Sequence, residues 1–367
     1  MRKIIFGGSF DPIHNGHLQI AKKAKDILKA DKVIFLIAKH PRWKDVKSED
    51  NHRLEMLKIA LKGISWAEIS LVEYNSQADV NYTYDSILKI KENDDSKLYF
   101  LLGSDQLELL DKWYEIDNLS RLVQLVCISR PNFLINRENL EKYHVELIEE
   151  EISPMSSTAL RNLNNMDCPK EVLDYIVENK LYFYNTLSSY MTEKRLNHTL
   201  SVSSLAYDIA ISNHLDGHKA YLSALLHDIG KELDINLQYQ YVKDNYPSLV
   251  DSIPRVLYHQ FYSEKIARET FKIKDQEILD SIKYHATGRK NMGVYEKIVY
   301  ASDKIEPTRG YDSSSLIEEC KKDINTGFID VLKENIKFFE QTNKSYHNKL
   351  TDQCIKYYLE GDKHESN

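Results

Sequence analysis

The first half of the chain alternates short apolar runs with helix-like segments, and this alternation constrains the fold more than any other feature. The runs are rich in Ile, Val, Leu and Phe and nearly continuous, as in strands buried on both faces. They cover residues 3–7, 33–38, 68–73, 98–103 and 123–129. Segments with helical spacing lie between them, for example at 17–30 and 51–63. This alternation predicts an α/β domain with a parallel sheet covered by helices on both faces.

From about residue 187 the strand-like runs stop and apolar residues recur at helical spacing. Five such segments cover residues 195–214, 219–233, 263–271, 275–288 and 293–306. Gly288 would stop one of these helices. A chain of 367 residues exceeds the size at which one core usually keeps growing. We therefore predict an α/β domain at 1–186 and an all-α domain at 187–367, with the boundary in the polar stretch 183–193.

Composition and charge narrow the classes of partner. Hydrophobic residues make up 42% and charged residues 29%, as in folded proteins. A net charge of −7 without a basic stripe disfavours nucleic acid and anionic membranes as partners. We expect a cytoplasmic protein, since no apolar run approaches the roughly 20 residues that span a bilayer. The cysteines lack C-x-x-C spacing and should be reduced, structural thiols; they are Cys127, Cys168, Cys320 and Cys354. The oligomeric state is not predicted.

The stretch GGSFDPIHNGH, at residues 7–17, follows the first expected strand. It therefore lies at the carboxyl edge of the sheet, where open α/β sheets bind ligands. Glycines let backbone N–H groups approach phosphate oxygens, and the helix starting near His17 offers further N–H groups. His14 and His17 are three residues apart, so both imidazoles could donate to one phosphoryl group as it gains charge. As an alternative, the glycines make an ordinary turn and the histidines are loop residues.

This stretch matches G-x-F-D-P-x-H-x-G-H and therefore resembles the nucleotidyltransferase superfamily, which implies a Rossmann-like sheet. Further segments resemble the nicotinate-nucleotide adenylyltransferases: FLLGSDQLELLDKWYEI, ISRP, NYTYDSI, MSSTALR and VLDYIVENKLYFY. The resemblance covers about residues 1–186. It implies a step of NAD biosynthesis in which the phosphate of nicotinic acid mononucleotide attacks the α-phosphorus of ATP and pyrophosphate leaves. Other superfamily members use acceptors such as phosphopantetheine, and the choice between nicotinate and nicotinamide mononucleotide stays open.

The resemblance also implies residue roles. His14, His17 and Arg161 would be catalytic, with ATP carrying Mg²⁺. The residues implied in binding ATP and its acceptor are Gly8, Ser9, Phe10, Lys44, Tyr82, Thr83, Gly103, Ser104, Asp105, Trp113, Ser157 and Thr158. The family often has P-P-H-K where this chain has PRWK, so only Lys44 carries over there. Tyr82 and Trp113 could instead be core aromatics, and Thr158 a helix cap.

The second half contains a dispersed set of metal-ligand types. His198, the adjacent pair His227 and Asp228, and Asp303 each fall in a segment of helical spacing. Helices of a bundle can bring such side chains together, and transition metals or Mg²⁺ and Mn²⁺ accept imidazole with carboxylate. A metal with open coordination positions can lower the pKa of bound water and polarise a phosphate. A lone buried histidine is more often a hydrogen-bonded core residue, so the prediction depends on the whole set.

The order His, His-Asp, Asp resembles the HD phosphohydrolase superfamily. Within that superfamily, the stretch from about residue 188 to 345 resembles the symmetrical diadenosine tetraphosphate hydrolases. The segments that carry this resemblance are RLNHTLSV, ALLHDIGK, YHQFYSEKIA, IKYHATGR and GVYEKIVYASDKIEPTRG. The likeness implies iron as the metal, with ligands His198, His227, Asp228 and Asp303, and gives Asp228 a catalytic role. It implies phosphate contacts from Lys231, His259, His285 and Arg309. His259 and His285 could instead hold a second metal ion, as in dinuclear HD enzymes.

Together the two halves predict a bifunctional enzyme. One half would transfer AMP to nicotinic acid mononucleotide, and the other would hydrolyse diadenosine tetraphosphate to two ADP. One rival hypothesis keeps the transferase but makes the second half a non-catalytic, nucleotide-sensing regulatory domain. In another, the HD domain acts on a different nucleotide phosphate. The predicted partners are small nucleotides only.

Overall fold

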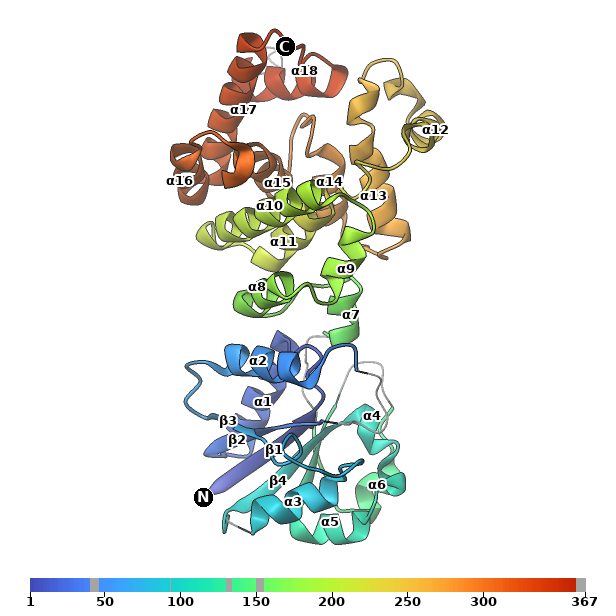
Figure 1. The fold of residues 1–367 in the computed structure, drawn as a ribbon, viewed down its shortest axis with the longest axis vertical. Coiled ribbons are helices and arrows are strands. Elements are labelled where there is room, and N and C mark those ends of the chain that lie inside the picture. Colours follow the sequence, from blue (N-terminus) through green and yellow to red (C-terminus); the bar gives the residue numbers. More distant parts are fainter. Residues whose placement is uncertain (40–45, 93, 130–133, 150–154, 361–367) are drawn as a thin grey trace, which may run out of the picture. The chain divides into compact units, whose positions relative to one another are not determined.

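The computed structural model describes residues 1–39, 46–92, 94–129, 134–149 and 155–360. The chain forms two compact units, residues 1–161 with 167–182 and residues 162–166 with 183–367. The predicted division between 186 and 187 falls inside the short helix α9 (Phe183–Ser188). Figure 1 shows the fold along the chain.

The N-terminal unit contains a six-stranded sheet in the order β3-β2-β1-β4-β5-β6, and every neighbouring pair is parallel. The strands are β1 (Arg2–Gly8), β2 (Lys32–Ile37), β3 (Ala67–Ser70), β4 (Lys97–Gly103), β5 (Gln124–Ile128) and β6 (Glu146–Ile148). The predicted parallel α/β sheet is confirmed. The edge strand β6 was not predicted, because its three residues are too short to show a period.

Helices cover this sheet because its strands bury side chains on both faces. Ile5 and Phe100 belong to one apolar cluster with α3 and α5, whereas Ile4 points to the opposite face and is also fully buried. α1 packs along β1 and β2, and α2 packs on β3 (Figure 1). The helices of this unit are α1 (Asn15–Ile27), α2 (Asp50–Leu61), α3 (Thr83–Lys91), α4 (Ser104–Leu107), α5 (Ile116–Leu122), α6 (Arg137–Lys142), α7 (Ser157–Arg161) and α8 (Lys170–Glu178), with a 3-10 turn at Leu110–Lys112.

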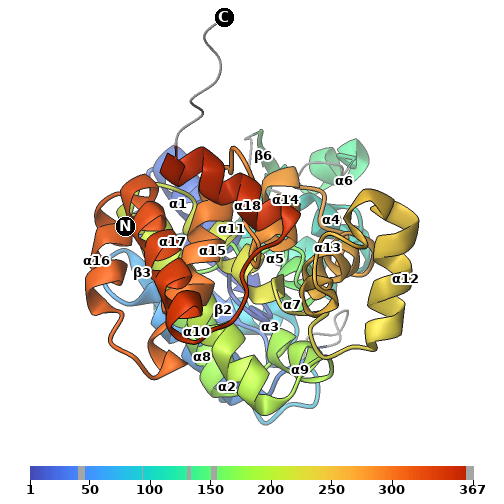
Figure 2. The ribbon, with the colours of Figure 1, turned by 90° about the horizontal axis from the view of Figure 1, so that it is seen from above.

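The C-terminal unit is helical throughout the described residues, as predicted. After α9 come α10 (Glu193–Ser212), α11 (Gly217–Leu226), α12 (Ile235–Asn245), α13 (His259–Glu269), α14 (Gln276–Tyr284), α15 (Val294–Ile305), α16 (Ser314–Lys322), α17 (Ile324–Gln341) and α18 (Lys349–Ile355). Short 3-10 helices occupy Pro247–Leu249, Arg255–Leu257 and Pro307–Arg309, and a π-helix occupies Lys356–Glu360. α10, α11 and α15 share the main apolar core with α16, α17 and α18. Figure 2 shows α11 and α15 near the centre of this unit, with α12 and α16 toward opposite edges.

Two predicted helices end earlier than their periodicity indicated. α11 stops at Leu226, so His227 caps it and Asp228 lies in the turn that follows, not within a helix. α14 stops at Tyr284, and Gly288 lies beyond it in a left-handed turn (φ 66°). A Cβ at Gly288 would lie 2.7 Å from Cys354 Sγ, so only glycine fits this turn. The apolar run continues past both helix ends because the turns are buried too.

The four cysteines are buried and free, in agreement with the prediction of structural thiols. Among the helices of the described ranges, none combines the length and apolarity needed to cross a bilayer.

Candidate active sites

The first candidate site lies where the strand order of the sheet reverses. β1 pairs with β2 on one side and with β4 on the other. Strands β2 and β3 therefore extend the sheet from β1 in one direction, and β4, β5 and β6 extend it in the other. Parallel sheets bind ligands in the crevice beyond the carboxyl ends of such strands. Gly8 ends β1 and leads into Ser9 and Phe10, while Gly103 ends β4 and leads into Ser104 and Asp105. The sheet therefore brings these two predicted nucleotide-binding loops to one edge.

His14 and His17 form a stacked pair at the start of α1. Their ring centroids are 3.7 Å apart with an interplanar angle of 28°, and the His14 N–H donates to His17 Nδ1 at 3.3 Å. The rings of Phe10 and His17 form a T-shaped pair with their centroids 5.2 Å apart. A Cβ at Gly16 would lie 3.0 Å from His14 Nδ1 and 3.2 Å from Met155 Cβ, so glycine permits this packing. The two imidazoles therefore share one side of a helix N-terminus, a position suited to an anionic ligand.

Asp11 anchors the loop between β1 and α1. It is buried, and its carboxylate accepts hydrogen bonds from the Lys47 N–H at 2.7 Å, Ser48 Oγ at 3.0 Å and Tyr182 Oη at 2.6 Å. Burial beside this carboxylate raises the pKa of the Tyr182 phenol. Tyr182 therefore stays a neutral donor near neutral pH. The network fixes the backbone from which the two histidines project.

Helix α7 is attached to the same loop. Arg161 Nη1 donates to the Asp11 carbonyl oxygen at 2.5 Å and lies 3.7 Å from Asp11 Oδ2. Its other terminal nitrogen donates to Thr158 Oγ1 at 2.9 Å, and Ser157 Oγ donates to the Pro12 carbonyl at 2.8 Å. The structure therefore attaches Ser157, Thr158 and Arg161 to the loop that leads to His14 and His17, although the three are about 140 residues away in sequence.

The residues predicted to recognise the acceptor occupy neighbouring segments. Tyr82 caps α3, Thr83 begins it, and the Tyr82 ring lies 4.4 Å from the ring of Tyr114. Trp113 is half-buried and meets Phe100 edge-on at 5.9 Å. Trp113 is thus partly a core residue, with one part of its ring accessible. Lys44 lies outside the described residues.

Arg53 supports the first site structurally and was missed by the sequence analysis. Its side chain is fully buried and donates to the carbonyl oxygens of Ser9 at 2.8 Å and Ala38 at 2.7 Å. It also pairs with Asp50 at 2.5 Å. Arg53 therefore ties the end of β2 to the motif loop. A signal was present, because Arg53 stands at helical spacing with Leu57 and Ala60 on the buried face of α2.

The second candidate site is built by five segments of the C-terminal unit. α10 supplies His198, the end of α11 supplies His227 and Asp228, and α15 supplies Asp303. The first residue of α13 is His259, and His285 caps the end of α14. All six predicted ligand or phosphate-contact residues of this set come together. Two groups have the spacing of metal ligands, His198 with His227 and Asp303, and His227 with Asp228 and His285.

Three buried histidines share one hydrogen-bonding pattern. Nδ1 of His227, His259 and His285 contacts the carbonyl oxygen three residues earlier, at 2.5, 2.8 and 2.7 Å respectively. A carbonyl only accepts, so each neutral ring is protonated at Nδ1 and bears a lone pair at Nε2. Burial lowers the pKa of His227 to about 3, and burial also lowers the pKa of the other two rings. These rings are neutral at physiological pH, as metal ligands must be.

The three Nε2 atoms converge on carboxylates. Asp228 Oδ1 lies 3.2 Å from Nε2 of His259 and 3.4 Å from Nε2 of His285, and those two nitrogens are 3.3 Å apart. His227 Nε2 lies 3.5 Å from Asp228 and 3.8 Å from Asp303, and within the described chain it has no hydrogen-bond partner. Lone pairs facing a carboxylate repel unless a cation lies among them. The donor set therefore fits a divalent metal of the type that accepts nitrogen and oxygen ligands.

Cationic side chains contact both carboxylates. Burial alone would raise the pKa of Asp303, but nearby positive and hydrogen-bonding groups keep it well below the usual range. For Asp303 these include Lys304 at 2.6 Å and Arg309 at 2.8 Å. Arg195 pairs with the second oxygen of Asp228 at 2.8 Å. Lys231 lies 2.9 Å from His259 Nε2, and burial lowers the pKa of its ammonium group.

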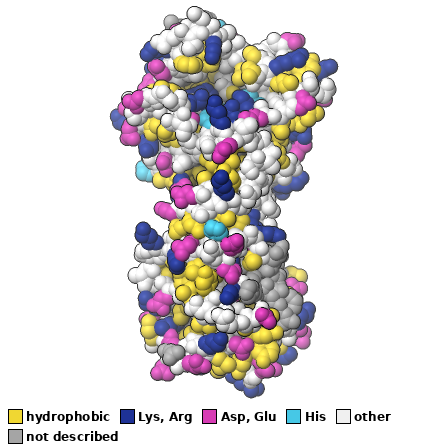
Figure 3. Space-filling view, in the orientation of Figure 1, with side chains coloured by type: hydrophobic (Ala, Val, Ile, Leu, Met, Phe, Trp, Pro, Cys, Tyr) yellow, Lys and Arg dark blue, Asp and Glu magenta, His cyan; other side chains and the backbone are white. Residues whose placement is uncertain are grey.

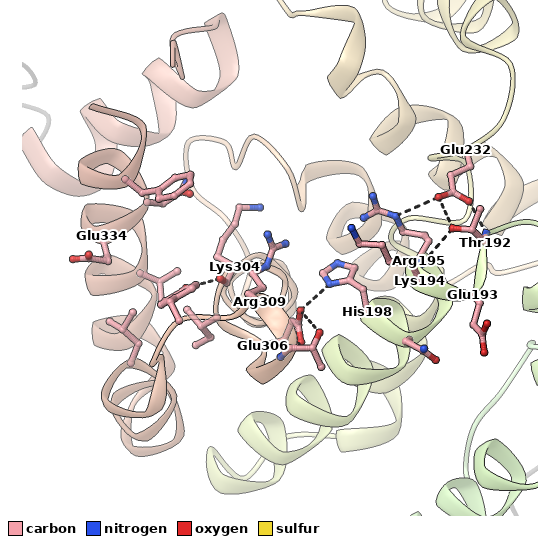
Figure 4. Close-up of a pocket in the computed structure, with 18 of the residues that line it drawn as sticks. Thr192, Glu193, Lys194, Arg195, His198, Glu232, Lys304, Glu306, Arg309 and Glu334 are labelled. Carbon is pink, nitrogen blue, oxygen red and sulfur yellow. Dashed lines mark hydrogen bonds and ion pairs between the residues drawn. The ribbon is translucent and has the colours of Figure 1, made fainter. Parts of the chain in front are cut away.

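A pocket of about 1290 Å³ opens beside this cluster. Its lining includes His198, Arg195, Lys304 and Arg309, and Figure 4 shows these side chains around a common space. Figure 3 shows Lys and Arg side chains gathered with a histidine on one face of the C-terminal unit. The site therefore combines a metal-ligand set with cations suited to a polyphosphate.

Arg195 and Glu306 were not predicted. Glu306 is buried and accepts from His198 Nδ1 at 3.0 Å, which leaves Nε2 of that ring directed at Asp303 at 3.1 Å. Carboxylates behind ligand histidines orient the ring and increase its basicity. Each residue is three positions from a predicted ligand, Arg195 from His198 and Glu306 from Asp303. Helical spacing around the ligands could therefore have indicated both.

Comparisons with known proteins agree with this division. Residues 5–163 match the cytidylyltransferase-like family and residues 195–308 match the HD domain. A Mycoplasma genitalium protein, named probable nicotinate-nucleotide adenylyltransferase/Ap4A hydrolase, is 32% identical over 345 residues, covering 90% of this chain and 96% of the relative. A Mycoplasma pneumoniae protein of the same name is 29% identical, covering 90% of this chain and 98% of the relative. A solved Clostridium acetobutylicum protein, titled a predicted HD superfamily hydrolase involved in NAD metabolism, is 28% identical with a TM-score of 0.44, covering 48% of this chain and 97% of that one.

The fold and the two sites define a class of protein in which a nucleotidyltransferase domain precedes a divalent-metal-binding HD domain. Within that class, the chain belongs to the family of two-domain nicotinate-nucleotide adenylyltransferase/Ap4A hydrolases, where Ap4A denotes diadenosine tetraphosphate.

Proposed function

We propose that the chain carries two enzymes. The N-terminal unit transfers AMP from ATP to nicotinic acid mononucleotide, and the C-terminal unit hydrolyses diadenosine tetraphosphate symmetrically to two ADP. The names of the full-length relatives support this pair of activities. The observation that carries the proposal is the presence of two separate phosphate sites in one chain, a stacked histidine pair at a helix N-terminus and a buried His/Asp cluster beside cations.

In the transferase, the phosphate of the mononucleotide attacks the α-phosphorus of ATP and pyrophosphate is released. His14 and His17 donate hydrogen bonds to the triphosphate and to the charge that develops on the phosphoryl oxygens. Arg161, held by its hydrogen bond to the Asp11 carbonyl, neutralises negative charge on the leaving pyrophosphate. The Mg²⁺ ion that enters with ATP would do the same. Loops after β1 and β4 bind the nucleotide, and Tyr82, Thr83 and Trp113 contact the pyridine ring. No covalent enzyme intermediate is needed.

In the hydrolase, four residues hold one divalent ion: His198, His227, Asp228 and Asp303. We further propose that His259 and His285, with Asp228 between them, hold a second ion, and that the metal is iron. The convergence of both Nε2 atoms on Asp228 Oδ1 supports the second position. When bound, the metal supplies a water of lowered pKa and polarises a phosphate. Because both histidines are then occupied as ligands, the phosphate contacts pass to Lys231, Arg309, Arg195 and Lys304.

The rival function is a nucleotide-sensing domain without turnover. Against it stands the complete ligand set, including the supporting hydrogen bond from His198 to Glu306 and the carbonyl partners of the three buried rings. A domain that only binds nucleotide would not need Nε2 lone pairs directed at carboxylates. The deciding experiment incubates the intact protein with diadenosine tetraphosphate and Fe²⁺, Mn²⁺ or Mg²⁺. We expect ADP as the product, while bound nucleotide with no turnover in any metal would favour the sensor.

A further inference from the structure

The pocket of the C-terminal unit has two chemically different ends. All Lys and Arg residues among its described lining come from α10, α15 and the turn after α15; they are Lys194, Arg195, Lys304 and Arg309. The opposite wall comes from α16 and α17 and offers no cation. Figure 4 shows Glu334 of α17 on one side and Arg195 on the other. The first end also carries Glu193, Glu232 and Glu306, but it alone offers cations, so we assign the polyphosphate to it.

The α16–α17 wall presents one face of a helix to the pocket. Val331, Asn335 and Phe338 of α17 recur at intervals of four and three residues, so they lie on one side of it, and Leu316 of α16 adds to the apolar surface. Val331 is buried, whereas Phe338 is 53% exposed. The same helix sends Phe328 and Leu332 fully into the core. Phe338 is thus an aromatic ring presented to the pocket and not to the core.

Polar groups on this wall are arranged for neutral ligand atoms. Asn335 Nδ2 donates to the hydroxyl of buried Tyr300 at 3.3 Å, which leaves its Oδ1 as an acceptor. The Glu334 carboxylate would repel phosphate but can accept from ribose hydroxyls or an amino group of a base. Tyr311 Oη donates to the Lys304 carbonyl at 2.6 Å, so its ring is held where the two ends meet.

We propose that the α16–α17 wall is the nucleoside subsite of the hydrolase, with one purine ring of the dinucleotide stacked on Phe338 and its sugar or base donors facing Asn335 and Glu334. The wall begins beyond residue 308, where the match to the HD domain ends. It would therefore supply contacts to the nucleoside in addition to the metal ligands and cations of the HD core. This inference rests on the proposed hydrolase function.

The test compares ligands with and without a base on the intact, metal-loaded protein. Calorimetry measures the binding of ADP and of inorganic pyrophosphate to the wild type, Phe338→Ala, Phe338→Tyr and Phe339→Ala. Phe339 is the control for loss of a neighbouring ring, because it is the same residue type on the same helix and contacts Tyr346 and the Phe338 ring, at 5.9 Å between centroids, but does not line the pocket. Phe338→Ala should weaken ADP binding roughly tenfold or more, the scale of losing one base stack. Pyrophosphate binding should not change, Phe338→Tyr should restore ADP binding, and Phe339→Ala should bind both ligands normally.

Unchanged ADP binding by Phe338→Ala would overturn the subsite. An equal loss of ADP and pyrophosphate affinity would also overturn it, because it would indicate a structural effect. The KM for diadenosine tetraphosphate separates this inference from the function on which it rests. If the wild type hydrolyses the tetraphosphate and Phe338→Ala keeps its KM, the subsite is wrong and the function stands. If the wild type prefers ADP to pyrophosphate through Phe338 but hydrolyses nothing, the subsite stands and the hydrolase function is wrong.

Discussion

The two sites that we propose for phosphate recognition differ in their physical construction. The N-terminal site uses a helix N-terminus, a glycine-containing loop and two stacked imidazoles, all held by hydrogen bonds within the protein. The C-terminal site directs imidazole lone pairs at carboxylates in a buried position. The described chain gives the Asp11 carboxylate of the first site three donors, whereas it gives His227 Nε2 of the second site no hydrogen-bond partner. We therefore expect the first site to be organised by the protein alone and the second to need a metal ion.

The largest expected effect comes from removing a carboxylate of the metal cluster. Asp228→Ala deletes the group on which His227, His259 and His285 converge, so metal should be lost and tetraphosphate hydrolysis should fall to background. Adenylyl transfer should stay within a few-fold. Metal content and both rates, measured on one preparation, check this. Asp208→Ala, at an exposed position of α10, is the matched control and should change nothing. Retained metal and hydrolysis in Asp228→Ala would contradict the ligand assignment.

Loss of the His17 imidazole should affect adenylyl transfer and not hydrolysis. His17→Ala removes a donor to the triphosphate and should lower the transfer rate by about two to three orders of magnitude, the usual scale for one such donor. Hydrolysis of the tetraphosphate by the same preparation serves as the control and should be normal. Near-normal adenylyl transfer would mean that His17 is an ordinary loop residue.

A smaller effect is expected at the acceptor pocket. Trp113 is half-buried against Phe100, so Trp113→Ala should remove a stacking surface and raise the KM for the mononucleotide roughly tenfold. The KM for ATP should change much less. Steady-state kinetics with each substrate varied in turn makes the distinction. Equal increases in both values would show that Trp113 acts only as a core residue.

The smallest effect should follow from loosening the Asp11 network. Tyr182→Phe removes the hydroxyl that donates to Asp11, while the Lys47 N–H and Ser48 remain as donors. We expect the transfer rate to fall roughly threefold, the order of one lost hydrogen bond. Thermal unfolding and hydrolysis should be close to normal. A loss as large as that of His17→Ala would mean that Tyr182 contacts substrate directly.

Local sequence was sufficient to predict the strands of the sheet and the all-helical second half, because both depend on periodicity. It was not sufficient for β6. Three residues are too few to show a strand period, and this segment is a strand because it pairs with β5. The ends of α11 and α14 were also missed, since buried turns continue the apolar pattern.

The site residues divide in the same way. Motifs predicted the histidines and aspartates, but the residues that orient them interact across long sequence distances. Arg53 reaches the carbonyl of Ser9, and Tyr182 reaches Asp11 from the far end of the unit. Local signals existed for Arg53, a charged residue on a buried helix face, and for Arg195 and Glu306, each three positions from a predicted ligand. Such contacts depend on the topology, which the sequence pattern alone does not specify residue by residue.

The most direct test of the comparison is to strip the metal from the wild-type protein and measure both activities. The protein is dialysed against a chelator, and its metal content is confirmed to be negligible. Adenylyl transfer is then assayed with the Mg²⁺ complex of ATP, and tetraphosphate hydrolysis is assayed before and after a divalent metal is restored. We predict transfer within about twofold of the untreated protein, no hydrolysis in the stripped protein, and recovery of hydrolysis with added metal. Hydrolysis that survives complete removal of metal, or transfer that disappears with it, would contradict the account.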